Sequence, residues 1–136
     1  MTSLAIHTLF ARWQKIPAFA RRAHRFSNTS LVLKRSRAKG GEWSSGMTYK
    51  RGLSFEIILR VGTNDADAHS VLLHEMAHVV CRWGYGRAHS DEWRDVFSRA
   101  LVEVGAMMKG HKGVTMKYFD GVGWGLFTEM LKEQVA

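Results

Sequence analysis

The sequence predicts a single α+β domain in which a small sheet is combined with helices before and after it. Three observations predict this class. Apolar residues recur at helical spacing near the N-terminus and again in the second half of the chain, and β-rich segments lie between these two regions. The length of 136 residues allows one domain with a core, and the composition, 46% hydrophobic and 24% charged, is that of a globular protein. We therefore treat 1–136 as one domain.

The first element is expected to be a helix. Ile6, Leu9, Phe10 and Trp13 follow the spacing i, i+3, i+4, i+7, which places them on one helical face. Pro17 then interrupts the pattern because it cannot continue a helical hydrogen-bond ladder.

Three strands are expected next. "TSLVLKRS" (29–36), "MTYKR" (47–51) and "LSFEIILRVG" (53–62) are rich in β-forming residues, and "KGGEWSSG" (39–46) is turn material between the first two. These segments predict a three-stranded antiparallel sheet.

Three helices are expected after the sheet, and the last of them is short. Asn64 has the character of an N-cap, with two aspartates in the following turn, and this helix should run to about Trp83, where glycines end it. Ser90 or Asp91 should cap the next helix, which extends from 92 to about 104. Its expected buried stripe is Trp93, Val96, Phe97, Ala100 and Leu101. From about 105 the chain becomes a glycine-rich extension, with a last short helix expected over 126–135.

Polar ionisable residues stand inside the first of these helices, in "LLHEMAHVV" (72–80). Because each residue of an α-helix turns by about 100°, His74 and His78 lie one turn apart on one face and can bind one metal ion. Glu75 is offset from both, which suits a general base beside the metal rather than a ligand. A catalytic zinc ion needs three protein ligands and one open position, so a third ligand must come from elsewhere.

His89 is the best candidate for that third ligand, since the glycine-containing loop before it allows the chain to double back. Glu92 and Glu103 are alternatives that would give a site of two histidines and one glutamate. His111 is possible but is not constrained by spacing, and His69 points about 140° away from His74. Cys81, one turn after His78, is better explained as a small buried residue.

The positive charge is concentrated in the first part of the chain. Residues 1–51 hold 11 lysines and arginines against one acid, whereas 52–136 hold 9 against 11. This asymmetry predicts a polyanion-binding face, and we expect DNA contacts from Arg21, Arg22, Lys34, Arg35 and Arg37. A solvated basic surface and an Arg-rich mitochondrial targeting segment are the alternatives.

The remaining features favour a cytoplasmic protein. A single cysteine excludes an internal disulfide and suits a reducing compartment. No apolar stretch reaches the length of a transmembrane helix, so no membrane partner is expected.

The motif "LLHEMAHVV" followed by "HSDEW" resembles the SprT-like zinc metalloproteases, the group that includes Spartan. The resemblance covers about 4–104 in layout, although its specific part is only 74–93. It implies a zincin-like fold, Zn²⁺ held by His74, His78 and His89, and Glu75 as the catalytic acid/base. It also implies protein substrates associated with DNA. Ser90 stands where the family motif has glycine, and no Cys-rich zinc ribbon follows.

These observations together predict a zinc-dependent endopeptidase. Zinc lowers the pKa of water and polarises a carbonyl, and Glu75 would take the proton of the attacking water and pass it to the leaving amine. Four residues are unranked candidates for an additional oxyanion donor: Tyr85, Arg87, His111 and Tyr118. The competing hypotheses are a catalytically silent zincin-like scaffold and a nucleic-acid-binding module with a structural metal.

Overall fold

The computed structural model describes residues 3–37, 39–41, 43–63, 65–83 and 89–107. Helix α1 (Ser3–Trp13) is followed by the 3-10 helical segment η1 (Pro17–Asn28), which begins at the proline predicted to end the first helix. The strands are β1 (Thr29–Arg35), β2 (Ser45–Arg51) and β3 (Ser54–Val61), with the short turn η2 (Lys39–Gly41) after β1. Helices α2 (Asp65–Val80) and α3 (Asp91–Met107) complete the described part.

The expected α+β class and the three strands are confirmed, but the prediction of an antiparallel sheet is wrong. The strand order is β1-β3-β2, and β1 pairs with β3 in parallel, while β2 and β3 pair antiparallel. The next strand in the chain, β2, is not the neighbour of β1 but lies on the opposite edge of the sheet. A tight turn at Gly52 (φ 61°) then reverses the chain, and β3 runs between β1 and β2. The central position suits β3 because Phe55, Ile57 and Leu59 are its most deeply buried residues.

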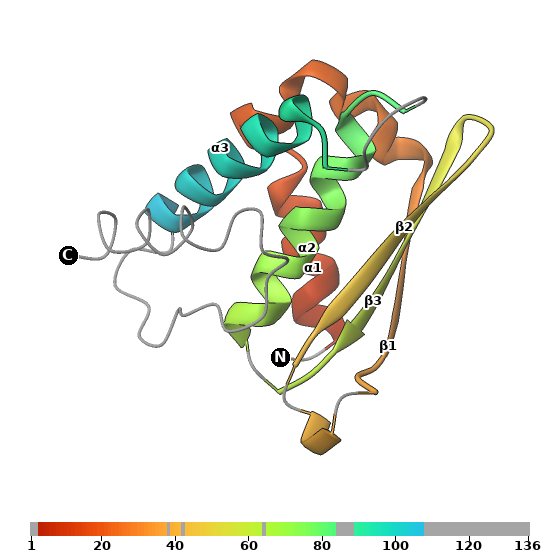
Figure 1. Ribbon diagram of the computed structural model, residues 1–136, viewed down its shortest axis with the longest axis vertical. Coiled ribbons are helices and arrows are strands. Elements are labelled where there is room, and N and C mark those ends of the chain that lie inside the picture. The colour runs from red at the N-terminus through yellow and green to blue at the C-terminus, as the bar shows by residue number, and fades with distance from the viewer. Residues whose placement is uncertain (1–2, 38, 42, 64, 84–88, 108–136) are drawn as a thin grey trace.

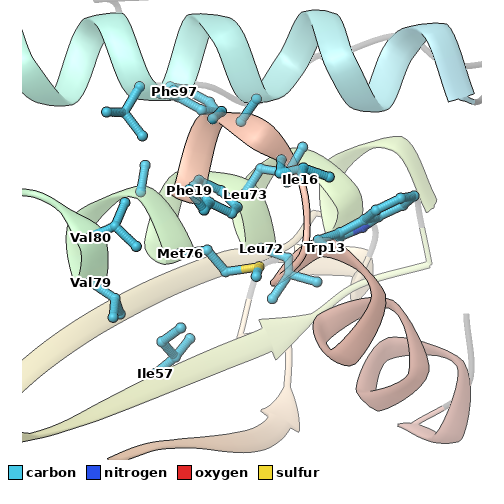
Figure 2. Close-up of a cluster of buried hydrophobic side chains, with 14 of the residues drawn as sticks. Trp13, Ile16, Phe19, Ile57, Leu72, Leu73, Met76, Val79, Val80 and Phe97 are labelled. Carbon is cyan, nitrogen blue, oxygen red and sulfur yellow. The ribbon is translucent and has the colours of Figure 1, made fainter. Parts of the chain in front are cut away.

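The helices cover one face of this sheet (Figure 1). Helix α2 lies in the middle of the packing and contacts α1, η1, α3, β2 and β3. Figure 2 shows side chains of α2 filling the space between Ile57 of the sheet and Phe97 of α3. Met76, Leu72 and Leu73 are at most 1% exposed, so α2 is fixed from several sides at once.

The start of α3 follows the expected signal, whereas its end at Met107 lies three residues beyond the expected end. Helix α3 begins after Ser90, whose hydroxyl accepts a hydrogen bond from the Trp93 backbone N–H at 3.2 Å. The expected stripe of α3 is buried throughout: Trp93, Val96, Phe97, Ala100 and Leu101. Helix α2 ends at Val80, three residues earlier than expected. Asn64, the glycines at 84 and 86 and the short helix expected over 126–135 lie outside the described residues.

Within the described ranges, none of the helices is both long enough and apolar enough to cross a membrane.

Candidate metal centre

Two histidines of the centre come from one face of α2. His74 and His78 are separated by one helical turn, and their Nε2 atoms lie 3.3 Å apart. Val71, Leu72, Leu73, Met76, Ala77 and Val79 of the same helix are buried. Packing of these apolar residues sets the rotation of α2, and the rotation places both imidazoles at the edge of the core, where they are partly exposed.

The third histidine arrives from the segment that leads into α3. The Nε2 atom of His89 lies 3.2 Å from that of His74. The capping interactions of Ser90 fix the start of α3 directly after this histidine, including a bond from the Arg94 N–H to the Ser90 carbonyl at 2.9 Å. The position of α3 against α2 therefore determines where the His89 ring lies.

The ring nitrogens of His78 and His89 each lie at the distance from that of His74 that a tetrahedral metal requires. Zinc–nitrogen bonds of about 2.05 Å at tetrahedral angles separate two ligand nitrogens by about 3.3 Å. The observed separations from His74 are 3.2 and 3.3 Å, and all three ligand atoms lie within 4.8 Å of one another. In the part of the chain that the structure describes, His74, His78 and His89 form the one cluster of three or more potential ligands with this property.

The ring of Trp93 supports all three imidazoles. Its centroid lies 4.8 Å from that of His74, 5.2 Å from that of His78 and 4.1 Å from that of His89. The Trp93 indole N–H also donates to the His74 carbonyl at 3.3 Å. Trp93 is only 1% exposed, so this residue of α3 connects the core to the rings that would hold a metal.

Burial keeps His74 in the form that binds metals. Desolvation, followed by repulsion from His89, lowers the pKa of His74 from 6.5 to about 3. The imidazole is therefore neutral near pH 7 and has a lone pair available for a metal ion. The approach of its Nε2 to Glu75 Oε2 at 3.7 Å is accordingly not an ion pair between charged groups.

Glu75 lies beside this cluster and is 4% exposed. Its Oε2 atom is 3.7 Å from His74 Nε2, while its Oε1 atom accepts a hydrogen bond from the Thr48 hydroxyl at 2.8 Å. The carboxylate therefore sits between the histidines and strand β2. A carboxylate next to a metal site can act as a general base or remain a structural acceptor.

Neither glutamate considered as a third ligand belongs to the cluster. Glu103 accepts a hydrogen bond from the Ala18 backbone N–H at 2.9 Å, so it fixes the start of η1. Glu92 accepts from the Arg82 N–H at 2.6 Å and from the guanidinium groups of Arg21 and Arg22, each at 3.2 Å. Burial raises the pKa of Glu92, but these donors outweigh burial and lower the pKa overall.

The cysteine and the other histidines that the structure describes stand apart from the centre. The ring of His69 faces that of Trp13 at 6.4 Å between centroids, and His7 and His24 are exposed. Cys81 is buried, and desolvation above all raises the pKa of its thiol to about 12, which disfavours the thiolate that metals bind. Tyr85, Arg87, His111 and Tyr118 lie outside the described residues.

The five basic residues expected to bind DNA do not form one group. Arg22 has 17% of its side chain exposed and donates to the Val80 carbonyl at 2.8 Å, whereas Arg21 is 70% exposed. Both precede β1, while Lys34, Arg35 and Arg37 are exposed at or just after its other end. The seven residues of β1, which span about 20 Å, lie in the chain between the two groups.

Two site features were missed by sequence reasoning. Thr48, taken only as a strand residue, donates to Glu75, and Gly46 lies against the same side chain. The alternation of β2 places both on one face, but no local signal shows that this face meets α2. Trp93 was expected only as a core residue, but its indole nitrogen also donates a hydrogen bond to the backbone of α2.

Comparisons of the chain with protein-family models, with curated proteins and with solved structures gave no match. The relationship to the SprT-like family therefore stays a prediction from the motif, and the site is assigned on geometry.

Proposed function

We propose that the protein is a zinc-dependent endopeptidase of the SprT-like type. The observation that supports this most strongly is the combination of three convergent imidazoles with a buried carboxylate beside them. His74, His78 and His89 would hold the zinc ion, which supplies Lewis-acid polarisation and makes water more acidic when bound. Three protein ligands leave one coordination position open, as a catalytic zinc site requires.

Glu75 is the residue that we propose as general base and acid. Its carboxylate lies 3.7 Å from His74 Nε2 and does not belong to the ligand cluster. From this position it would take a proton from the water that attacks the peptide carbonyl. It would then pass that proton to the nitrogen of the leaving amine.

Strand β2 is the element that would align the substrate. It pairs with β3 on one side, and in the described sheet its other edge has no strand partner. An extended peptide can add to such an edge through main-chain hydrogen bonds. Because Thr48 of β2 contacts Glu75, a peptide on this edge would run next to the proposed base.

DNA-associated proteins are the substrate class that we propose, with Lys34, Arg35 and Arg37 as the DNA contacts. Arg60 joins them, because it pairs across the sheet with Lys34 and its guanidinium donates to the Arg35 carbonyl at 3.4 Å. Exposed positive charges gathered at one end of the sheet attract phosphates. Arg22 is engaged by Val80 and Glu92, so it is not part of this proposed surface.

The test of the proposed activity is Glu75→Gln, which retains size and polarity but removes the base. Zinc content and folding should survive, while hydrolysis of an unstructured basic protein should fall by about 10²-fold or more. Assays with and without DNA would cover a requirement for an activator. Glu56→Gln, a glutamate on the outer face of β3, is the matched control and should retain activity.

Two results would overturn the proposal in different directions. Equal cleavage by the wild type and Glu75→Gln would assign the base to another residue. No cleavage by the wild type on any substrate, with zinc bound, would favour a zincin-like scaffold or a nucleic-acid-binding module with a structural metal.

A further inference from the structure

Strand β2 presents two residues to the metal helix. Gly46 pairs with Leu59 and Thr48 with Ile57, and these partners on β3 are fully buried beneath the helices. Directly paired residues of an antiparallel ladder share a face of the sheet. Gly46 and Thr48 are therefore the β2 residues that face α2, whereas Met47 between them lies on the opposite face.

The Thr48 hydroxyl is bonded to the proposed base. Its Oγ1 donates to Glu75 Oε1 at 2.8 Å, and the Glu75 carbonyl lies farther away, at 3.3 Å. A hydroxyl has only one proton, so the shorter and charge-assisted bond to the carboxylate is favoured. This bond joins the side chain of Glu75 to a strand that does not belong to its own helix.

Gly46 leaves the space that the Glu75 side chain occupies. A Cβ atom at position 46 would lie 2.8 Å from Glu75 Cγ, 2.9 Å from Val71 Cγ1 and 3.2 Å from Glu75 Oε2. The first two distances are shorter than carbon atoms tolerate, so the side chains of Glu75 and Val71, or α2 as a whole, would have to move. Glycine is needed at this position for close approach.

We propose that Gly46 and Thr48 form a seat on β2 that holds the Glu75 carboxylate beside the histidine cluster. Both are positioning residues: Gly46 allows the side chain to lie against the strand, and Thr48 fixes the direction of the carboxylate. This inference rests on the proposed function of Glu75 as a base. A base displaced by about 1 Å from its working position costs about 10²-fold in rate, so such a seat has a measurable effect.

The seat also connects the base to the substrate. The same strand that would pair with an extended peptide holds the carboxylate that activates water. Because Glu75 belongs to α2, a shift of β2 relative to α2 would change both the position of the substrate and the direction of the carboxylate.

The first test removes the hydroxyl alone. Thr48→Val is nearly isosteric and retains β-branching, and we expect about a tenfold loss of kcat with KM and zinc content unchanged. Thr48→Ser restores the donor and should recover most of the activity. Thr29→Val is the matched control, because it also removes a hydrogen-bonded hydroxyl from a strand. The Thr29 hydroxyl, on β1, donates to the Arg25 carbonyl at 2.7 Å, and its loss should leave kcat unchanged. Wild-type kcat in Thr48→Val, or no recovery in Thr48→Ser, would overturn the role of Thr48.

The second test fills the space. Gly46→Ala should lose about 10²-fold in kcat while retaining zinc, because the added carbon displaces Glu75. A crystal structure of this variant should show the carboxylate moved away from its wild-type position, and the structure of Thr48→Val should show it rotated. An unmoved carboxylate in both variants would exclude the seat.

The crystal structures also separate the seat from the proposed function. If the wild type cleaves no substrate, the endopeptidase proposal fails, but the position of Glu75 in the variants still decides whether β2 holds it. If the wild type is active and the carboxylate does not move, the endopeptidase proposal stands and the seat is wrong.

Discussion

The histidine centre and the basic end of the sheet differ in how their side chains are held. His74 and His78 come from α2, and His89 comes from the segment that leads into α3, which packs on α2. The buried Trp93 contacts all three rings. Lys34, Arg35 and Arg37 are instead exposed at the end of an edge strand and in the segment after it. Packing therefore fixes the positions of the histidine rings, whereas the basic end of the sheet concentrates positive charge on side chains that are not held by packing.

This difference predicts two kinds of response to substitution. A preorganised site loses its function when one ligand is removed, because the remaining ligands no longer complete the coordination sphere. A surface of exposed charges changes in small and roughly equal steps, because each charge contributes independently and is screened by salt.

The largest effect is expected at the metal helix. The wild type should contain about one zinc ion per chain, and His78→Ala should contain none after dialysis against a chelator-free buffer. Plasma mass spectrometry of the purified protein measures this ratio. His24→Ala, which removes an exposed histidine from η1, is the matched control and should retain zinc. Full zinc retention in His78→Ala would show that the three histidines are not the metal site.

A strong but graded effect is expected at the third ligand. His89→Ala should lower zinc affinity sharply, because His89 Nε2 lies 3.2 Å from His74 Nε2. Glu103→Ala should retain zinc, since Glu103 is bonded to the backbone of Ala18. Competition with a chromophoric chelator gives both affinities. Loss of zinc from Glu103→Ala with retention in His89→Ala would invert the assignment and favour a site of two histidines and one glutamate.

The cluster of three histidines could be predicted from the sequence because its geometry is mostly local. The spacing of His74 and His78 fixes their relative position once a helix is assumed, and the helix follows from the apolar residues around them. His89 follows His78 by only 11 residues, which limits where its side chain can lie. Thr48 could not be found in this way, because its contact with Glu75 spans 27 residues and depends on where β2 packs.

The fold shows the same limit. Each strand was predictable from its own residues. The partner of β1 was not, because β1 could pair with the free edge of either β2 or β3. Apolarity favours β3 as the central strand, although the three segments predicted only an antiparallel sheet. Arg22 was also misjudged from the sequence, which indicated an exposed charge. The backbone of η1 bends at Arg22 (φ −135°, ψ 34°), and its side chain contacts the end of α2.

A moderate effect on stability is expected at these arginines. Arg22 donates to the Val80 carbonyl and to Glu92, and Arg22→Ala should lower the free energy of unfolding by about 2 kcal/mol because a charged hydrogen-bond network is broken. Arg21 is 70% exposed and forms a surface ion pair with Glu92. Arg21→Ala should therefore change the free energy of unfolding by less than about 0.5 kcal/mol. Urea denaturation of both variants measures the difference. Equal destabilisation would show that the hydrogen bonds of Arg22 contribute no more to stability than the surface ion pair of Arg21.

The smallest effect per residue is expected at the basic end of the sheet. If Lys34, Arg35 and Arg37 contact phosphates, each one lost should reduce the slope of log affinity against log salt by about 0.9 for duplex DNA. Fluorescence anisotropy with a labelled duplex at several salt concentrations gives this slope. The triple change to glutamine should thus remove up to three counterions, while folding and zinc content stay constant. A second triple variant at Lys15, Arg94 and Arg99 removes the same charge from exposed positions on other elements. Equal slopes for the two triple variants would show that DNA senses only the net charge, and a wild-type slope near zero would remove DNA from the proposal.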